Sequence, residues 1–399
     1  MKLPLLNQKK SIKGKKIFLR VDWNVPLSGH LTDEDLLKLE RSVPVIRDYI
    51  KRGAIVFIAT HLGRPRGRDL KFSTKNLGRV FEIHYRLKLG FLGQALDTSD
   101  GLAEAKEIII KAHNGTAYLL ENVRFYKGEE KNDPKLSKAF ASLADMFVND
   151  AFASCHREHS SVAGIAKYLP HFAGPTLSQE VSALSKLLNK QKRPYLAFIG
   201  GAKISTKIEV IKILLQVADK VFIGGAMATA FFAAKKYEIG KSYVEKEGIA
   251  IAKKLLTSKK LFLPIDAVIA KKIDAQVKAY PVSVKEIRKT DIIGDIGTET
   301  MFAWAAEIKK AKTIVWNGPM GVAELEKFSH GSMFLARVIA ARSKGLAYGV
   351  IGGGDTLPVI LKSGMSEWVD HLSTGGGAML EFIAKRGVLP GIKAITQKK

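Results

Sequence analysis

Side chains suited to holding a small, highly anionic molecule recur in the first half of the 399-residue sequence. Asp22 and Asn24 lie two residues apart in RVDWNVP, so on an extended backbone their side chains point the same way. Arginine forks and imidazoles are groups that bind phosphate and carboxylate. Such groups occur at His61 and Arg64 in THLGRP, at Arg124 in ENVRF, and at His156, Arg157 and His159 in CHREHSS.

Each of these clusters has a simpler explanation when it is taken alone. An arginine after a strand is commonly solvated or ion-paired, and an Asp-x-Asn pair is also turn chemistry. Zinc would suit His156 and His159, but the sequence offers no obvious third ligand, and Cys155 is its only cysteine. Taken together, the four clusters favour an anion site over a metal site.

Glycine-rich segments distinguish the second half of the sequence. Three of them follow apolar runs and precede helix-like segments, so the backbone and a free helix N-terminus can approach a phosphate. The segments are GGAKISTK (200–207), GGGDT (352–356) and STGGGAMLEF (373–382). The candidate nucleotide-binding glycines are Gly200, Gly201, Gly225, Gly352, Gly353 and Gly354, and the last segment adds Gly375, Gly376 and Gly377.

Charged side chains accompany these glycines. Lys203 and Lys207 are four residues apart and share a face if the helix has begun there, where they would neutralise phosphate charge. Asp355, followed by Thr356, is placed to hold Mg²⁺ carrying ADP or ATP. Glycines that merely permit tight turns are the alternative, which three such segments with lysines and an aspartate disfavour.

The common nucleotide-binding signatures do not fit. Residues 240–242 end like a Walker A loop, but position 235 is lysine rather than glycine. No G-x-G-x-x-G motif occurs, and the H-R-D and D-F-G signatures of protein kinases are missing.

Apolar, β-branched runs alternate with helix-like segments along the whole chain. Most are continuous rather than alternating, which is typical of strands buried on both faces of a parallel sheet. We predict an α/β fold with two open, Rossmann-like parallel sheets, one per half, and ligands beyond the carboxyl ends of the strands. The runs are KIFLRVD, AIVFIATH, TAYLLENV, MFVNDAF, YLAFIGG, KVFIGGAM, LFLPIDAVIA, TIVWNGP and LAYGVIGGGD.

A helix joins the two predicted domains. The segment PTLSQEVSALSKLLNKQKRP begins and ends with proline and has helical apolar periodicity. We therefore expect an N-terminal domain over 1–172, a hinge helix over 173–192 and a C-terminal domain over 193–389.

The formal charge of +26 would attract phosphorylated metabolites, nucleic acid and anionic membranes alike. A lysine-rich surface explains it best; aromatic residues make up only 8% and show no interleaving with a basic face, which argues against a dedicated nucleic-acid role. The N-terminus lacks the apolar core of a signal peptide, and the apolar run 221–234 is too short to span a membrane. We expect a soluble, cytoplasmic protein with no membrane partner.

The motifs, taken in their order along the chain, resemble those of the phosphoglycerate kinase family. The motifs RVDWNVP, HLGRP, ENVRF, NDAF with HREHSS, GGAK, WNGPMGV, GGGDT and STGGGA occur in that family's order. The resemblance spans about residues 10–391, essentially the whole chain.

The resemblance implies two α/β domains on a helical hinge, with the C-terminal residues 390–399 returning to the N-terminal domain. It implies a monomeric glycolytic enzyme that binds 3-phosphoglycerate or 1,3-bisphosphoglycerate in one domain and MgADP or MgATP in the other. By matching position, the residues similar to phosphoglycerate ligands are Asp22, Asn24, Lys38, His61, Arg64, Arg124 and Arg157.

The resemblance also implies roles on the nucleotide side. Lys203 looks like a phosphate-binding lysine, and Lys207 like the lysine that contacts the phosphates during transfer. Asn317 resembles a phosphate-side ligand, and Glu324 the residue that bonds the ribose hydroxyls. Asp355 resembles the aspartate linked to Mg²⁺, with Thr356 beside it, and Gly375 to Gly377 match the loop that faces the transferring group.

The chain departs from the family pattern in its charge and at two motifs. Lys38 holds the place of a family arginine that stabilises charge during transfer, and Arg41, three residues on, is the alternative for that role. Residues 153–155 are Ala-Ser-Cys where the family has Gly-Thr-Ala, so added bulk is expected to restrict that loop.

Phosphoryl transfer needs positioning, charge neutralisation and exclusion of water rather than a general base. The chemistry would then depend on hinge closure, Lys207, arginines, Mg²⁺ and the amides of 375–377. Two rival functions are a different acyl-phosphate or small-molecule kinase, and a binding protein that has lost activity. The first would lack the HLGRP and HREHSS clusters and the second would lack Lys207 or Asp355, yet all are present.

Overall fold

The computed structural model describes residues 3–6, 11–26, 30–189 and 191–397. The chain divides into two compact units, Met1–Ser182 with Val388–Lys399, and Ala183–Gly387. The division falls inside α6 (Pro175–Asn189), within the segment that the sequence predicts to join two domains. Each unit contains a six-stranded parallel sheet, which confirms the predicted fold class.

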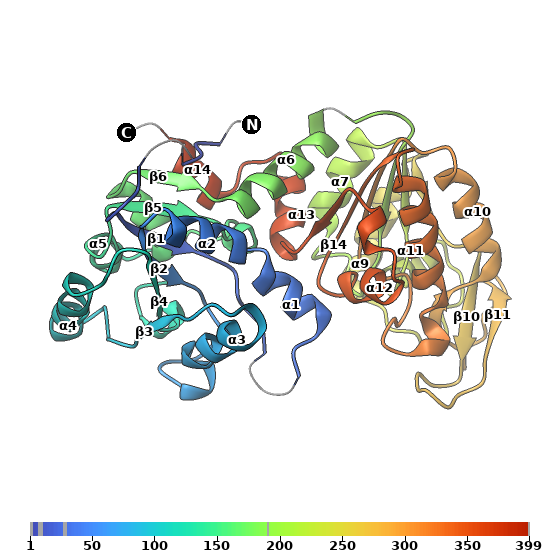
Figure 1. Ribbon diagram of the computed structural model, residues 1–399. Coiled ribbons are helices and arrows are strands. Elements are labelled where there is room, and N and C mark those ends of the chain that lie inside the picture. The colour runs from blue at the N-terminus through green and yellow to red at the C-terminus, as the bar shows by residue number, and fades with distance from the viewer. Residues whose placement is uncertain (1–2, 7–10, 27–29, 190, 398–399) are drawn as a thin grey trace. The chain divides into compact units, whose positions relative to one another are not determined.

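The sheet of the first unit has the order β3-β4-β2-β1-β5-β6, and all its pairings are parallel (Figure 1). Its central strands are buried along most of their length, as their continuous apolar sequences predict. The strands are β1 (Lys16–Arg20), β2 (Ile55–Ala59), β3 (Gly90–Leu92), β4 (Thr116–Leu120), β5 (Met146–Asn149) and β6 (His171–Ala173).

Helices surround this sheet, and local sequence explains where several of them begin. Thr32 and Asp35 form a reciprocal capping box at the start of α1, and Asp133 accepts a hydrogen bond at the start of α5. The helices are α1 (Asp33–Glu40), α2 (Val43–Lys51), α3 (Lys75–Tyr85), α4 (Ser99–Ile110) and α5 (Pro134–Ala141).

The C-terminal helix α14 (Pro390–Thr396) belongs to this first unit, where it lies beside β6 (Figure 1). The Gly391 N–H donates to the Cys155 carbonyl at 2.9 Å. A Cβ at Gly391 would lie 3.0 Å from the Cys155 Cα, so glycine permits this close approach.

The sheet of the second unit has the order β15-β14-β13-β7-β8-β9 and is also parallel throughout. Phe198 on β7 and Phe222 on β8 stack with ring centroids 4.6 Å apart, beneath the indole of Trp304. The strands are β7 (Tyr195–Ile199), β8 (Lys220–Ile223), β9 (Leu261–Phe262), β13 (Thr313–Asn317), β14 (Tyr348–Gly352) and β15 (His371–Ser373).

The helices of the second unit follow its strands in the alternation that the sequence predicts. They are α7 (Ile208–Val217), α8 (Met227–Ala234), α9 (Lys246–Leu255), α10 (Thr298–Ile308), α11 (His330–Ser343), α12 (Leu357–Lys362) and α13 (Gly377–Ala384).

One predicted strand is wrong. The run LFLPIDAVIA is interrupted at Pro264, which has no N–H for a ladder, and only β9 stays in the parallel sheet. The rest forms β10 (Asp266–Ala270), which pairs antiparallel with β11 (Ala279–Ser283) and β12 (Ile292–Ile296) in a separate three-stranded sheet. The buried carboxylate of Asp266 accepts hydrogen bonds from Glu299 N and Thr300 N at the start of α10, and these bonds compensate the cost of its burial.

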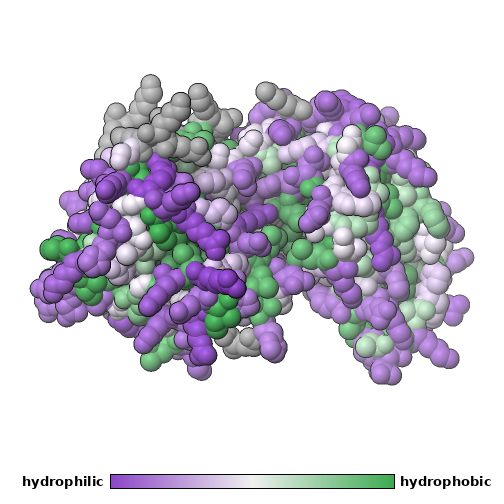
Figure 2. Space-filling view, in the orientation of Figure 1, coloured by the Kyte–Doolittle hydropathy of each residue, from purple (hydrophilic) through white to green (hydrophobic). Residues whose placement is uncertain are grey.

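The visible surface is largely hydrophilic over both units (Figure 2). Within the described ranges, no helix is long and apolar enough to cross a membrane.

Candidate functional site

The first unit gathers its candidate anion ligands at the carboxyl end of its sheet. Asp22 follows β1, His61 follows β2, Arg124 lies in the 3₁₀ turn after β4, and Arg157 follows β5. Parallel strands end at one edge of a sheet, so side chains far apart in sequence converge there.

The charged side chains of this cluster act on one another's pKa, which indicates that they lie close together. Burial raises the pKa of Asp22, while the charges of Arg20, Lys38, Arg124 and Arg157 act to lower it. Asp22 Oδ1 is buried and has no hydrogen-bond partner among the described residues, and Arg124 Nε is buried with only an ion-pair contact of 3.4 Å to Glu130 Oε1, whose side chain is 63% exposed. Buried polar atoms are rarely left without a hydrogen bond, so Asp22 Oδ1 above all indicates a place for a ligand.

His61 is held as a neutral imidazole. Its pKa lies well below the ordinary value because of burial and the nearby charges of Arg20, Arg124 and Arg157. Its Nδ1 lies 3.2 Å from an Arg20 guanidinium nitrogen and 3.8 Å from Asp22 Oδ1.

Asn24 and Arg64 complete the predicted set from neighbouring loops. The Gly63 N–H donates to Asn24 Oδ1 at 2.8 Å, which ties the loop after β1 to the loop after β2. Arg124 also donates to the Gly63 carbonyl. Arg64 is exposed. The pKa of Arg124 is lowered mainly by burial and by the charge of Arg157, and the charges of Arg20 and Arg64 lower it further.

Lys38 and Arg41 have different surroundings. Lys38 forms a 2.6 Å ion pair with Glu34 on α1, and its charge acts on Asp22. Arg41 instead donates to Glu180 of α6 at 3.1 Å, and its carbonyl accepts from Thr176. Lys38 is thus the residue whose charge reaches the anion cluster, whereas Arg41 contacts the long helix.

The Ala-Ser-Cys loop is accommodated without backbone strain. Ala153 lies in a 3₁₀ turn (Phe152–Ser154) and is not among the described residues with positive φ, so a Cβ is tolerated there. His156 Nε2 accepts from Arg157 Nε at 3.0 Å, so this histidine orients an arginine.

In the second unit, Lys207 lies among the glycine loops at the carboxyl end of the sheet. Its ammonium donates to the Gly200 carbonyl at 2.7 Å and to Asn317 Oδ1 at 2.9 Å. Burial lowers the pKa of Lys207 to about 8, and Asp355 acts in the opposite direction. Asp355 and Lys207 are therefore within each other's field, although Asp355 itself is exposed.

Asn317 and Thr356 connect these loops. Asn317 Nδ2 donates to the Gly352 carbonyl at 2.8 Å, and the Gly318 N–H donates to Thr356 Oγ1 at 2.7 Å. A Cβ at Gly353, where φ is +112°, would lie 2.8 Å from Asn317 Nδ2. The glycine is thus required both by its backbone conformation and by a close neighbour.

The glycines of the other loops also pack tightly or begin a helix. A Cβ at Gly225, where φ is +65°, would lie 2.6 Å from the Gly201 nitrogen. Gly376 has φ +51° and precedes α13, which begins at Gly377, and nothing lies within 4 Å of a Cβ built at Gly376 or Gly377. The loop 375–377 therefore leaves open space at a helix N-terminus.

Lys203 and Glu324 lie apart from this network. The helix after GGAKISTK begins only at Ile208, so Lys203 and Lys207 do not share a helical face as the spacing had suggested. Lys203 is exposed and its charge acts on Glu245. Glu324 lies exposed in a turn between β13 and α11.

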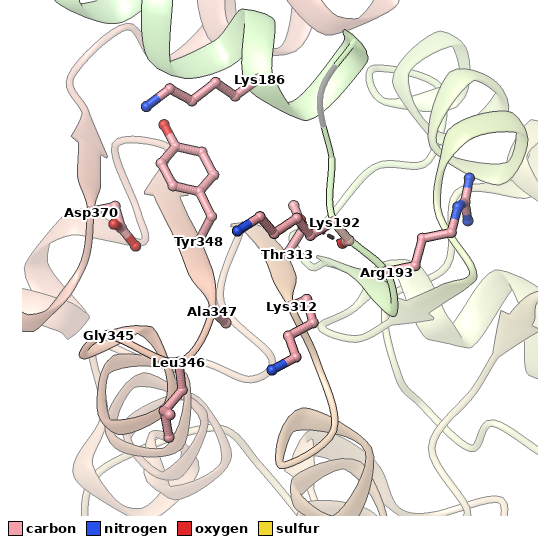
Figure 3. Close-up of a pocket in the computed structure, with 10 residues that line it drawn as sticks. All are labelled: Lys186, Lys192, Arg193, Lys312, Thr313, Gly345, Leu346, Ala347, Tyr348 and Asp370. Carbon is pink, nitrogen blue, oxygen red and sulfur yellow. Dashed lines mark hydrogen bonds between the residues drawn. The ribbon is translucent and has the colours of Figure 1, made fainter.

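A cavity of about 690 Å³ opens at the opposite, amino-terminal end of the strands (Figure 3). Lys186, Lys192 and Lys312 extend toward it from three segments. Cations are stabilised at helix C-termini, and α6 and α11 both end nearby, so these lysines have a structural explanation. The cavity is remote in the fold from the glycine loops and is no part of the nucleotide site.

Sequence reasoning missed three polar residues beneath the first cluster: Arg20, Glu129 and Ser161. All three are buried, and Arg20 reaches His61. The signal for Arg20 was present, because an arginine interrupts an otherwise apolar strand in KIFLRVD. Glu129 and Ser161 carried no comparable signal.

Comparisons with known proteins agree with this arrangement. The phosphoglycerate kinase family model matches residues 7–386. The phosphoglycerate kinase of Thermosipho africanus is 42% identical over 396 residues, covering 97% of this chain and 96% of that protein.

Solved structures give the same result. Phosphoglycerate kinase from Coxiella burnetii superposes with a TM-score of 0.84 at 36% identity, covering 99% of each chain. Phosphoglycerate kinase from Pyrococcus horikoshii superposes with a TM-score of 0.85 at 30% identity, covering 98% of each chain. This chain belongs to the phosphoglycerate kinase family.

Proposed function

We propose that this chain catalyses the reversible transfer of a phosphoryl group from 1,3-bisphosphoglycerate to MgADP, giving 3-phosphoglycerate and MgATP in glycolysis and gluconeogenesis. A β-phosphate oxygen of ADP attacks the acyl phosphorus, and the bond from phosphorus to the carboxyl oxygen breaks. The carboxylate leaves already ionised, so no proton has to move. The observation that carries the proposal is Lys207, a partly buried ammonium that donates to Gly200 and Asn317 among the glycine loops.

The first unit would hold the phosphoglycerate. Arg64, Arg124 and Arg157 would bind its phosphate and carboxylate oxygens, and Asn24 and His61 would orient it. Lys38 would supply positive charge to the reacting group. The buried Asp22 Oδ1, which has no hydrogen-bond partner among the described residues, supports this assignment, because a substrate hydroxyl can donate to it.

The second unit would hold the nucleotide. The glycines of the three loops would approach its phosphates, Lys203 and Asn317 would contact them, and Glu324 would bond the ribose. Asp355 fits the Mg²⁺ that arrives with the nucleotide, since Mg²⁺ is usually bound by one or two carboxylates together with phosphates. When bound, the ion neutralises phosphate charge.

Transfer then depends on bringing the two reactants together. We place the hinge at residues 173–192, supported by the division of the chain within α6. Closure would exclude water and bring Lys207 and the amides of 375–377 to the charge that develops on the transferred group. We further propose that the enzyme acts as a cytoplasmic monomer. Light scattering of the purified protein tests its oligomeric state.

A coupled assay tests the activity. Purified protein given 1,3-bisphosphoglycerate and MgADP should form ATP, and omission of Mg²⁺ should abolish most of the rate. If ATP formation stays at the level of a protein-free control, the proposed activity is wrong.

A further inference from the structure

A chain of buried polar groups lies beneath the anion cluster of the first unit. It runs from Glu129, which is fully buried, through Ser161 to Arg20, which is 1% exposed, and ends at His61. None of Glu129, Ser161 or Arg20 is among the residues assigned to substrate in the proposed function.

The direction of each hydrogen bond is fixed by the donors available. Arginine has only N–H donors, so Arg20 Nε donates to Ser161 Oγ at 3.0 Å. The single hydroxyl proton of Ser161 is then free for Glu129 Oε1, at 2.5 Å, while the Ser161 N–H donates to Glu129 Oε2 at 3.0 Å. Ser161 thus accepts from the cation and donates to the anion.

The same rule fixes the state of His61. Its Nδ1 faces an Arg20 guanidinium nitrogen at 3.2 Å and must accept this hydrogen bond. An imidazole that accepts at Nδ1 is neutral and carries its proton on Nε2. The side chain of His61 is therefore offered as an Nε2–H donor, which is the form suited to an anionic ligand.

The negative charge of Glu129 stabilises the buried guanidinium of Arg20. A buried arginine without a counter-charge carries a large desolvation penalty. Glu129 supplies the largest compensating negative charge on Arg20, ahead of Asp22, and the Ser161 N–H in a π-helical turn (Ser160–Gly164) donates to Glu129. Turns of this kind are frequent at functional sites.

We propose that Glu129 is a positioning residue: acting through Ser161 and Arg20, it holds His61 as the Nε2–H tautomer that donates to the phosphoglycerate. This inference rests on the proposed function, in which His61 contacts that substrate. It assigns to Glu129 an effect on phosphoglycerate binding and none on the nucleotide.

Glu129→Gln keeps the shape of the side chain and removes its charge. Arg20 then loses the larger of its two compensating charges and keeps only that of Asp22, its hydrogen bond to His61 weakens, and His61 exchanges between tautomers. We expect the KM for 3-phosphoglycerate to rise about tenfold, the value of one hydrogen bond, with the KM for MgATP unchanged. In ¹⁵N-histidine spectra, His61 should change from a single Nε2–H tautomer in the wild type to an averaged pair of signals.

Glu121→Gln is a matched control. Glu121 is also a buried glutamate of this unit, and it accepts from a serine hydroxyl (Ser73, 2.8 Å) and a backbone N–H (Thr74, 2.9 Å). Its replacement should lower stability by a similar amount but leave the His61 tautomer as in the wild type. A tautomer change in both variants would mean that general loosening, not Glu129, is the cause.

Ser161→Ala covers the case in which Glu129→Gln does not fold. It keeps both charges and removes the hydroxyl between them, so the same changes are expected at smaller size. A wild-type tautomer and KM in either folded variant would overturn the proposal. Failure of the proposed function is distinguishable, because an inactive wild type would still show whether the His61 tautomer depends on Glu129.

Discussion

Lys207 is the residue whose replacement gives the sharpest test of the nucleotide site. Holding its ammonium in the free protein is unfavourable, because burial lowers its pKa from the ordinary 10.5 to about 8. That difference corresponds to about 3 kcal/mol. Bound phosphates would supply the missing negative charge, and charge that develops during transfer would be stabilised most.

Lys207→Met should therefore separate activity from stability. We expect kcat to fall by about 10²–10³, the loss typical of removing one preorganised charge or donor, with a much smaller change in the Kd for MgADP. The unfolding free energy should rise by about 1 kcal/mol, because removing the partly buried charge outweighs the loss of two hydrogen bonds of about 1 kcal/mol each. Steady-state kinetics, calorimetric titration with MgADP and urea unfolding measure the three quantities.

The pH dependence of activity and of stability provides a second test of the role of Lys207. As pH rises through about 8, the free enzyme loses the Lys207 proton, so kcat/KM for MgADP should fall. Over the range from about pH 8 to 10.5 the unfolded chain retains a proton that the folded chain has lost, so this lysine's unfavourable contribution to stability diminishes. Lys207→Met should lack both effects.

Lys212→Met is the matched control, since Lys212 is an exposed lysine on α7 that pairs only with Glu209 among the described residues. Its kcat and its pH profile should equal those of the wild type. The reasoning is refuted if Lys207→Met weakens MgADP binding with kcat intact, or if it lowers stability by more than 1 kcal/mol.

Three further predictions concern the first cluster, a glycine loop and the core. Lys38→Ala should lower kcat about tenfold or more, whereas Arg41→Ala should mainly reduce unfolding free energy by about 1–3 kcal/mol through its contact with α6; equal kcat values for both would contradict this. Gly353→Ala should weaken MgADP binding and cost about 1–3 kcal/mol of stability, and wild-type titration curves would disprove it. Phe222→Ala should cost about 3–5 kcal/mol in urea unfolding, against less than 0.5 kcal/mol for the exposed Ile110→Ala; similar losses would contradict the assigned core.

The sequence sufficed for the two parallel sheets because their central strands are buried on both faces. Such strands have continuous apolar sequences, and each of the nine predicted runs supplies one strand of a parallel sheet, although LFLPIDAVIA also contains β10 of the antiparallel sheet. The short edge strands β3, β6 and β15 were not predicted, since three residues leave too little pattern to recognise. The antiparallel sheet is not predicted, because LFLPIDAVIA looks like a single apolar strand although Pro264 separates β9 from β10.

The candidate sites show a different limit. Motifs identify which loops carry functional side chains, but the role of each charged side chain depends on residues that are distant in sequence and close in the folded protein. Lys38 and Arg41 look interchangeable from helical spacing, yet the charge of Lys38 on α1 acts on Asp22, whereas Arg41, directly after α1, pairs with Glu180 of α6. Only tertiary structure separates the two.

Glu129 extends this argument to buried charge. In sequence it is the first of two adjacent glutamates, and nothing local distinguishes it from Glu130, whose side chain is 63% exposed. The fold buries Glu129 because a strand 109 residues earlier carries Arg20 into the same interior, where either charge alone would be strongly unfavourable. A residue whose role is to balance another buried charge has no motif of its own, so it is recognisable only once that partner has been located.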